Sequence, residues 1–152
     1  MTDGQVQTPQ PNIELQQLDW HEAQALAKPI RQTVFIEEQG VPEAEEWGHG
    51  DKVSLHIIAK FNGKAVGTAR LTVDGKIGRM AVLKTHRRLG IASIMLAELI
   101  KTAKQQGQQQ LKLNAQTHAQ GFYGKHGFIA HGNEFMDAGI PHVEMTLPLD
   151  PN

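Results

Sequence analysis

The stretch IGRMAVLKTHRRLGIASIML, residues 77–96, decides the fold. Its first part is β-like, its middle, KTHRRLG, is a basic turn with one glycine, and its end begins a helix. That helix should run from about Ile91 to Gln106, because Ile91, Met95 and Leu99 recur at a spacing of four residues. A turn of this kind directs backbone N–H groups and the positive end of a helix toward an anion. The stretch therefore predicts a strand–turn–helix unit with an anion site at the turn.

Two common phosphate-binding motifs do not fit this turn. A P-loop would need Gly-Lys-Ser/Thr at the start of the helix, where the sequence has Leu89-Gly90-Ile91. A dinucleotide-binding turn would need three spaced glycines after a parallel strand, and only one glycine is present. A basic turn capped by glycine and holding no ligand remains an alternative at this point.

The residues before the turn predict an antiparallel meander. Asn62-Gly63 and Asp74-Gly75 are strong hairpin signals, because both dipeptides adopt positive φ at low cost. They separate three β-like segments, residues 55–61, 65–73 and 76–83.

The N-terminal part predicts a tail, a strand and two helices. Residues 1–12 are polar and contain two prolines, which is typical of a disordered tail, and residues 13–18 resemble a strand. Asp19, with Glu22 three residues later, should cap a helix that ends near Lys28. A second helix should begin at Pro29 and end near Gln39, before Gly40. The acidic stretch that follows, residues 42–51, is expected to be a loop.

The C-terminal part completes a mixed sheet. Leu111, Leu113 and Ala115 alternate with polar residues, and a strand after a crossover helix should be parallel to the strand before it. A short helix at 119–125 and two strands, near 128–131 and 143–147, follow. We therefore expect one α+β domain over residues 13–152, with a mostly antiparallel sheet flanked by helices.

Composition narrows the class of protein. The chain has 152 residues, 15 Lys and Arg, 16 Asp and Glu, and a net charge of −1, which argues against a nucleic-acid or membrane partner. It has no cysteine, which excludes disulfides, thiolate metal sites and a cysteine nucleophile. There is no apolar run of about 20 residues and no signal-peptide pattern, so we expect a cytoplasmic protein. Neither a His-Glu-x-x-His metal motif nor a Gly-x-Ser-x-Gly hydrolase elbow is present.

The segment RRLGIA resembles the acyl-CoA-binding motif of the GNAT superfamily of N-acyltransferases, Arg/Gln-x-x-Gly-x-Gly/Ala. Arg87, Gly90 and Ala92 occupy its defined positions. Three further segments are similar to a small bacterial-type subgroup or to the second motif of the family: VFIEEQGVP (34–42), GFYGKHGF (121–128) and GIPHVEM (139–145). The resemblance spans about residues 13–149. It implies the GNAT fold, in which a parallel pair of strands is splayed at the acyl-CoA site.

The resemblance also implies roles for individual residues. Backbone N–H groups of residues 88–93 would hold the coenzyme A pyrophosphate. Tyr123 would be the general acid for the thiolate, or else only an aromatic packed under the cofactor. A backbone N–H of Met80 or Ala81, at a bulge that Gly78 makes easy, would polarise the thioester carbonyl. The residues implied in acyl-CoA binding are Met80, Ala81, Val82, Arg87, Arg88, Leu89, Gly90, Ile91, Ala92, Ser93, Asn114 and Tyr123.

The general base is not given by the motif, because the third meander strand carries no carboxylate. Glu38 is the first candidate, and partial burial should raise its pKa toward neutrality. Glu37 has similar helical spacing. His142 is the second candidate because an imidazole titrates near neutral pH, and His56 is the third.

We therefore expect an N-acetyltransferase that uses acetyl-CoA and no metal, with a small-molecule or peptide amine attacking the thioester directly. Transfer of another acyl group, an oxygen acceptor and a coenzyme A-binding module without turnover are the alternatives. The acidic run 43–46 weakly suggests a cationic acceptor. The sequence leaves open whether the chain forms a homodimer.

Overall fold

The computed structural model describes residues 12–150, apart from the side chain of His49. The tail expected over residues 1–12 lies outside this range except for Asn12. The N–H of Asn12 donates to Asn62 Oδ1 (2.9 Å), and the N–H of Asn62 donates to the Asn12 carbonyl (2.8 Å). Asn12 therefore belongs to the edge of the folded sheet.

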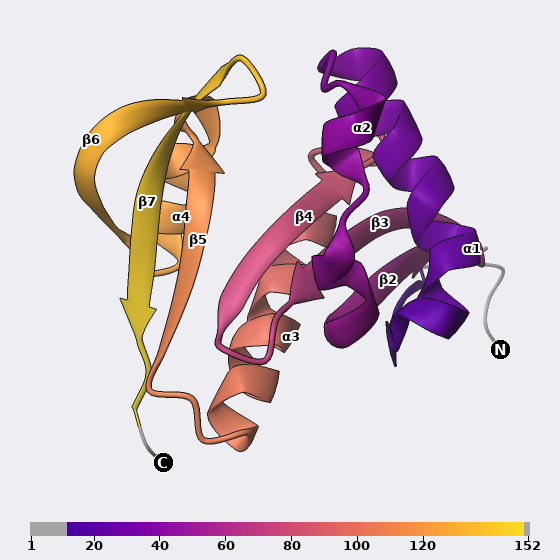
Figure 1. The fold of residues 1–152 in the computed structure, drawn as a ribbon. Coiled ribbons are helices and arrows are strands. Elements are labelled where there is room, and N and C mark those ends of the chain that lie inside the picture. The colour runs from indigo at the N-terminus through magenta and orange to yellow at the C-terminus, as the bar shows by residue number, and fades with distance from the viewer. Residues whose placement is uncertain (1–11, 151–152) are drawn as a thin grey trace, which may run out of the picture.

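Seven strands form one sheet in the order β1-β2-β3-β4-β5-β7-β6, and every neighbouring pair is antiparallel except β4 and β5 (Figure 1). The strands are β1 (Ile13–Leu18), β2 (Leu55–Phe61), β3 (Lys64–Leu71), β4 (Lys76–Val82), β5 (Gln110–Gln116), β6 (Ile129–Asp137) and β7 (Ile140–Pro148). The helices are α1 (Trp20–Arg31), α2 (Glu43–Glu46), α3 (Ile91–Gln105) and α4 (Gln120–Lys125), with shorter or wider turns at η1 (Gln32–Glu38), η2 (His49–Val53), η3 (Lys84–His86) and η4 (Thr117–Ala119). The expected α+β architecture is confirmed.

The meander β2–β3–β4 forms as expected, but its two turns differ. Asn62 and Gly63 both have positive φ (49° and 86°), whereas in the second turn only Gly75 does (85°). A Cβ on Gly75 would lie 2.9 Å from the Gln110 carbonyl oxygen, so glycine permits a close approach between this turn and the start of β5.

The expected break between two helices at Pro29 is wrong. Helix α1 continues through Pro29 to Arg31, although Pro29 has no N–H to donate to the preceding turn and so removes one backbone hydrogen bond. The chain then widens into the π-helical turn η1, which buries Val34 and Phe35. The cap at Asp19 is confirmed, since its Oδ1 accepts from the Glu22 N–H at 3.0 Å.

The acidic stretch expected as a loop is instead mostly helical. It forms the single turn of α2 and the 3-10 turn η2. Its carboxylates face different ways, because Glu43 and Glu45 are exposed whereas Glu46 and Asp51 are buried.

The parallel pair β4–β5 is short. Only Lys76 with Lys112 and Ile77 with Leu113 are in register, and beyond them the two strands diverge, as the gap between β4 and β5 in Figure 1 shows. The same part of β4 carries a bulge, since Thr68 pairs with Ala81 but Arg70 pairs with Gly78. The bulge was expected near Gly78, but the residue with positive φ is Arg79 (51°). The splay and the bulge leave backbone groups of β4 outside the ladder.

Helix α3 covers one face of the sheet and carries much of the core. Ile91, Met95, Leu96 and Leu99 are buried as their spacing predicts. Close packing requires a glycine below the helix, because a Cβ on Gly67 would lie 3.2 Å from Met95 Cε. Within residues 12–150, no helix has the length and apolarity needed to cross a bilayer.

Candidate active site

Two cavities meet along β4. The smaller, about 370 Å³, lies between β4, the turn after it, the start of α3 and α4. The larger, about 690 Å³, lies where β4 and β5 diverge. Both cavities are lined by Met80, Ala81, Val82, Arg87, Ala119 and Tyr123. A molecule in one cavity can therefore meet a molecule in the other beside the bulged strand.

The smaller cavity gathers most of the residues predicted to bind acyl-CoA. Leu89 and Asn114 are the exceptions, because Leu89 is exposed outside both cavities and Asn114 lines only the larger one. The predicted residues that line the smaller cavity are Met80, Ala81, Val82, Arg87, Arg88, Gly90, Ile91, Ala92, Ser93 and Tyr123.

The turn before α3 has an unusual backbone. Arg88 and Gly90 both adopt left-handed conformations, with φ of 66° and 82°. Gly90 is the N-cap of α3, and no side chain caps the helix. The first N–H groups of a helix have no partner within it, so these donors are available to an anion.

Arg87 uses three donors within the protein. Its Nε donates to the Val82 carbonyl (2.9 Å), and its two Nη atoms donate to the two oxygens of Glu38 (2.6 and 2.7 Å). These hydrogen bonds lower the pKa of Glu38, which contradicts the expectation that burial would raise it. Arg88 is exposed and has no hydrogen bond or ion pair to another residue in the described range. Arg88 is therefore the arginine better placed to contact phosphate.

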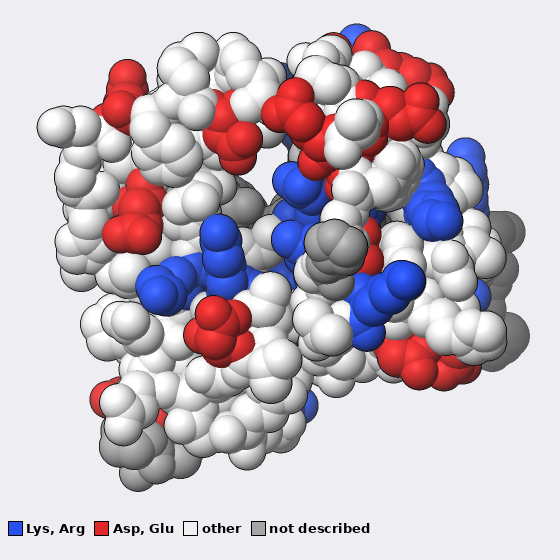
Figure 2. All heavy atoms as spheres, viewed as in Figure 1, with Lys and Arg blue, Asp and Glu red and all other residues white. Residues whose placement is uncertain are grey.

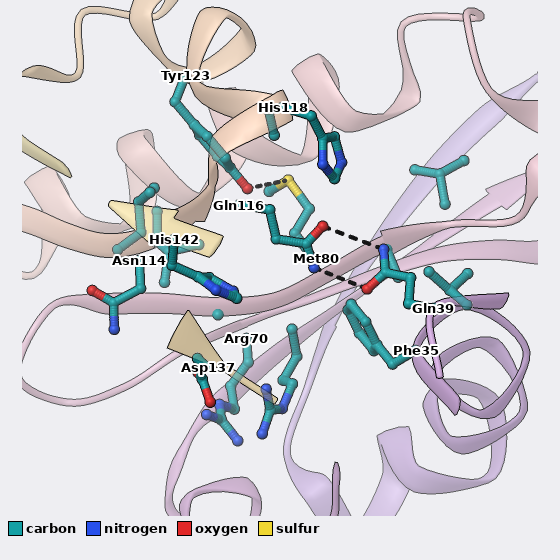
Figure 3. A pocket seen from close by; sticks show the side chains of 18 of the residues that line it. Phe35, Gln39, Arg70, Met80, Asn114, Gln116, His118, Tyr123, Asp137 and His142 are labelled. Carbon is teal, nitrogen blue, oxygen red and sulfur yellow. Dashed lines mark hydrogen bonds between the residues drawn. The ribbon is translucent and has the colours of Figure 1, made fainter. Parts of the chain in front are cut away.

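Tyr123 of α4 lies at the junction of the two cavities. Its hydroxyl points to Met80 Sδ at 3.8 Å, as Figure 3 shows. Burial raises the pKa of Tyr123 to about 12, so the hydroxyl keeps its proton at neutral pH. Phe122 and Phe128 pack edge-on against its ring, with centroids 5.1 and 5.9 Å away, and fix its direction.

The structure separates the four candidates for the general base. Glu38 and His142 line the larger cavity, whereas Glu37 and His56 do not. His142 is 9% exposed and its Nδ1 lies 2.7 Å from the Ile140 carbonyl. A carbonyl only accepts, so Nδ1 carries a hydrogen, and in the neutral form of the ring the lone pair is then on Nε2.

His56 is packed inside the protein and is held by its neighbours. It is buried against Trp20, with ring centroids 4.8 Å apart, and its Nε2 donates to the Asp51 carbonyl at 2.8 Å. Burial lowers its pKa. The third-ranked candidate therefore packs behind the sheet and away from both cavities.

A pair of amides across the splayed gap was not predicted from the sequence. Gln39 and Gln116 exchange hydrogen bonds of 3.4 and 2.9 Å, which join the end of η1 to the end of β5 (Figure 3). Glutamines are so common in exposed positions that no spacing could have indicated this contact.

A buried cluster of charges was also missed. Arg31 is fully buried and donates to Glu46 Oε2 (2.7 Å) and to both oxygens of Asp51 (2.8 and 3.2 Å). Its guanidinium lies between Trp20 and Trp47, 5.4 and 5.0 Å from their ring centroids. Glu46 is thus turned inward and already paired, which weakens the suggestion that the acidic run attracts a cationic acceptor.

The electrostatics of the two carboxylates differ. Burial raises the pKa of Glu46 despite its arginine partners. For Asp51, burial acts in the same direction but is outweighed by hydrogen bonds from Arg31 and Arg70, so its pKa is lowered. Among residues 12–150, no three His, Asp or Glu side chains lie close enough together to hold a metal ion.

Comparison with known proteins identifies the family and the fold. Residues 19–149 match the family described as acetyltransferase (GNAT) domain. The chain is similar to YjcF of Bacillus subtilis, an uncharacterized N-acetyltransferase, with 42% identity over 120 residues, 76% of this chain and 86% of the relative. Among solved structures it is similar to an acyl-CoA N-acyltransferase from Pseudomonas aeruginosa (25% identity, TM-score 0.78) and to Escherichia coli ElaA (26% identity, TM-score 0.78). Each of these likenesses covers 90% of this chain and 99% of the solved one.

Proposed function

Because the chain belongs to the GNAT acetyltransferase family, we propose that it transfers the acetyl group of acetyl-CoA to a primary amine by direct attack in a ternary complex. The observation that carries this proposal is the meeting of two cavities at Met80–Val82 and Tyr123. The thioester would lie at this junction, with coenzyme A in the smaller cavity and the amine in the larger one.

The residues present fit an acyl-CoA. Uncapped N–H groups at the start of α3 and the free guanidinium of Arg88 suit the pyrophosphate. Beyond Ile77, β4 is not paired to β5, so its edge is available to the amides of the pantetheine arm. Arg87 would act differently from Arg88, because it holds Glu38 and Val82 and so braces the wall between the cavities.

The reaction needs three groups from the protein. As the amine nitrogen bonds to the carbonyl carbon, the bulge in β4 offers the N–H of Met80 or Ala81 to the oxygen that gains negative charge. When the carbon–sulfur bond breaks, the Tyr123 hydroxyl donates its proton to the departing thiolate. The amine proton passes to a base on the side of the larger cavity.

For that base we propose His142 in place of Glu38. Both oxygens of Glu38 already accept hydrogen bonds from Arg87, and its pKa is lowered, so it has little tendency to take a proton at neutral pH. The Nε2 of His142 has a lone pair, and the side chain lines the larger cavity (Figure 3). Glu38 would then be a positioning residue that holds Arg87.

The test combines calorimetry with turnover. Coenzyme A should bind the protein, and acetyl-CoA should release free thiol when amines, polyamines, amino acids and peptides are supplied in turn. Binding without thiol release from any acceptor or acyl-CoA would leave a coenzyme A-binding module. If coenzyme A does not bind at all, the proposed function is wrong.

A further inference from the structure

Two arginines line the far end of the larger cavity. Arg70 extends from β3 and Arg79 from the bulge in β4, and neither lines the smaller cavity. Figure 3 shows the Arg70 side chain at the end of the cavity opposite Tyr123, and Figure 2 shows Lys and Arg side chains within the hollow of this face, with acidic side chains over α2 at its rim. This end of the cavity is therefore cationic.

The buried carboxylates do not neutralise these arginines. Arg31 makes the closest contacts to both Glu46 and Asp51. Arg70 Nη1 contacts Asp51 Oδ1, which Arg31 also contacts, at 3.0 Å. Arg79 Nε is farther from its carboxylate, 3.5 Å from Glu46 Oε2. Three guanidinium groups thus face two carboxylates, so the cluster carries one positive charge in excess. Lys76 and Asp137 also line this cavity and carry opposite charges, so the excess of one positive charge remains when both are counted.

The two arginines also have unused donors. Within the described residues, the buried Nε atoms of Arg70 and Arg79 have no hydrogen-bond partner. Burying such donors without a partner is costly, so a site that leaves two of them unsatisfied favours an incoming acceptor group. The Arg70 guanidinium lies against β4 at Gly78, where a Cβ would be at ordinary contact distance, 3.6 Å from Nη2.

We propose that this end of the larger cavity binds an anionic group of the amine acceptor, with a carboxylate as the best fit. The inference rests on the proposed function and names its substrate class: an amine that also carries a carboxylate, such as an amino acid or the end of a peptide. A guanidinium presents parallel N–H donors that match two carboxylate oxygens. The phosphates of coenzyme A do not account for these arginines, because they belong at the start of α3 in the smaller cavity.

This inference replaces the cationic acceptor that the acidic run suggested. Glu43, Glu45 and Glu46 do not line the larger cavity, and Glu46 is held by Arg31. The charge that an acceptor would meet at the far end of the larger cavity, away from the thioester, comes from the arginines.

The experiment compares each acid with its own amide. ω-Amino acids with two to six carbons and a set of L-α-amino acids are assayed for thiol release from acetyl-CoA, alongside their primary amides and aminoalkylphosphonates. At least one acid should exceed its amide in kcat/KM by about tenfold or more, because hydrogen bonds between charged groups are the strong ones. A preference for phosphonates would identify phosphate as the true anion. Equal rates for acids and amides in every pair would overturn the proposal.

Variants assign the preference to the arginines. Arg79→Gln should reduce the acid-to-amide ratio of kcat/KM about tenfold, mainly through KM, and Arg79→Lys should restore part of it. Lys101→Gln, which removes an exposed charge of α3 outside both cavities, should leave the ratio unchanged. A ratio that Arg79→Gln does not change, together with an unchanged ratio in Arg70→Gln, would also overturn the proposal.

A failure of the proposed acetyl transfer can be distinguished from a failure of the anion site. If no amine of either kind releases thiol, transfer is wrong, and the anion site is then measured by calorimetry with N-acetylated ω-amino acids and their amides on the protein with coenzyme A. Tighter binding of the acids that Arg79→Gln abolishes would support the site, and equal binding would overturn it.

Discussion

Arg87 and His142 have partners that no sequence motif specifies. Arg87 could be recognised from RRLGIA, but its bonds to Glu38 and Val82 join segments about fifty and five residues away. The sequence made Glu38 the first candidate for the general base, with the expectation that partial burial would raise its pKa. The pKa depends instead on the partner, and partners distant in sequence emerge only from the fold.

The first prediction separates the two candidate bases. His142→Gln should lower kcat/KM at pH 7 by about 10²-fold or more and remove the acidic limb of the pH–rate profile, because the proton acceptor is lost. Glu38→Gln should lower activity less and keep that limb, since Glu38 only positions Arg87. Glu37→Gln is the control and should behave as the wild type. If Glu38→Gln removes the limb while His142→Gln keeps it, the base is Glu38, as the sequence alone suggested.

The second prediction concerns the acid. Tyr123→Phe should reduce kcat by about 10²-fold and leave coenzyme A affinity nearly unchanged, because the ring still packs against Phe122 and Phe128 while the hydroxyl is gone. With a pKa raised to about 12, the wild-type hydroxyl stays protonated through pH 10, so its ionisation should not limit the rate there. Steady-state kinetics and calorimetry check both parts. Unchanged turnover with chemistry rate-limiting would reduce Tyr123 to a packing residue.

At the scale of elements, turns, caps and helices were predicted correctly where the conformation depends on only a few neighbouring residues. Asn62-Gly63, the Asp19 cap and the apolar stripe of α3 all formed as their spacing predicts. The prediction at Pro29 was wrong because a proline can either begin a helix or lie within one. The sequence around Pro29 does not show which position it takes. The bulge was expected near Gly78, yet Arg79 adopts the positive φ, and its side chain reaches the Glu45 carbonyl and Glu46.

The third prediction tests the turn before α3. Gly90→Val should abolish most of the rise in thermal midpoint that coenzyme A causes, because a β-branched residue disfavours φ of +82° and reshapes the N–H groups at the helix start. Gly107→Val is a matched control. Its φ is +78°, it also has open space around the Cα, and it lies at the opposite end of α3. Thermal unfolding with and without coenzyme A should show both variants destabilised, with the ligand shift retained only in Gly107→Val. Equal shifts in both would place the phosphate site elsewhere.

At the scale of the whole molecule, the buried charge cluster holds α1, α2, η2 and β3 together. Its members are scattered between Arg31 and Arg79, and each charge alone resembles a surface residue in the sequence. The topology, the splay and the turn before α3 could be anticipated because a family motif and hairpin signals indicate them. The cationic end of the larger cavity could not, because it arises where three distant segments meet.

The fourth prediction is that His56 makes stability depend on pH. Its pKa in the folded protein lies below the unfolded value of about 6.5, so its contribution to stability is complete above pH 6.5 and is lost as pH falls through the folded-state pKa. His56→Gln keeps a donor for the Asp51 carbonyl but does not titrate. Between pH 7.5 and 5.5 the thermal midpoint should fall more steeply in the wild type than in the variant. Glu46 and Asp51 titrate in both proteins, so parallel curves would show that His56 protonates equally well when folded.

The short β4–β5 ladder also bears on how the protein is made. Strands β1 to β4 and the helices α1 and α3 come from residues 13–105, whereas β5, β7 and β6 come from residues 110–148. During synthesis the first part emerges from the ribosome with its own strand partners, and it can begin to fold before the rest has been translated. The last three strands then add to β4 through two residue pairs only. The larger cavity has one wall from each part, so a nascent chain that has not reached β5 has not yet formed it.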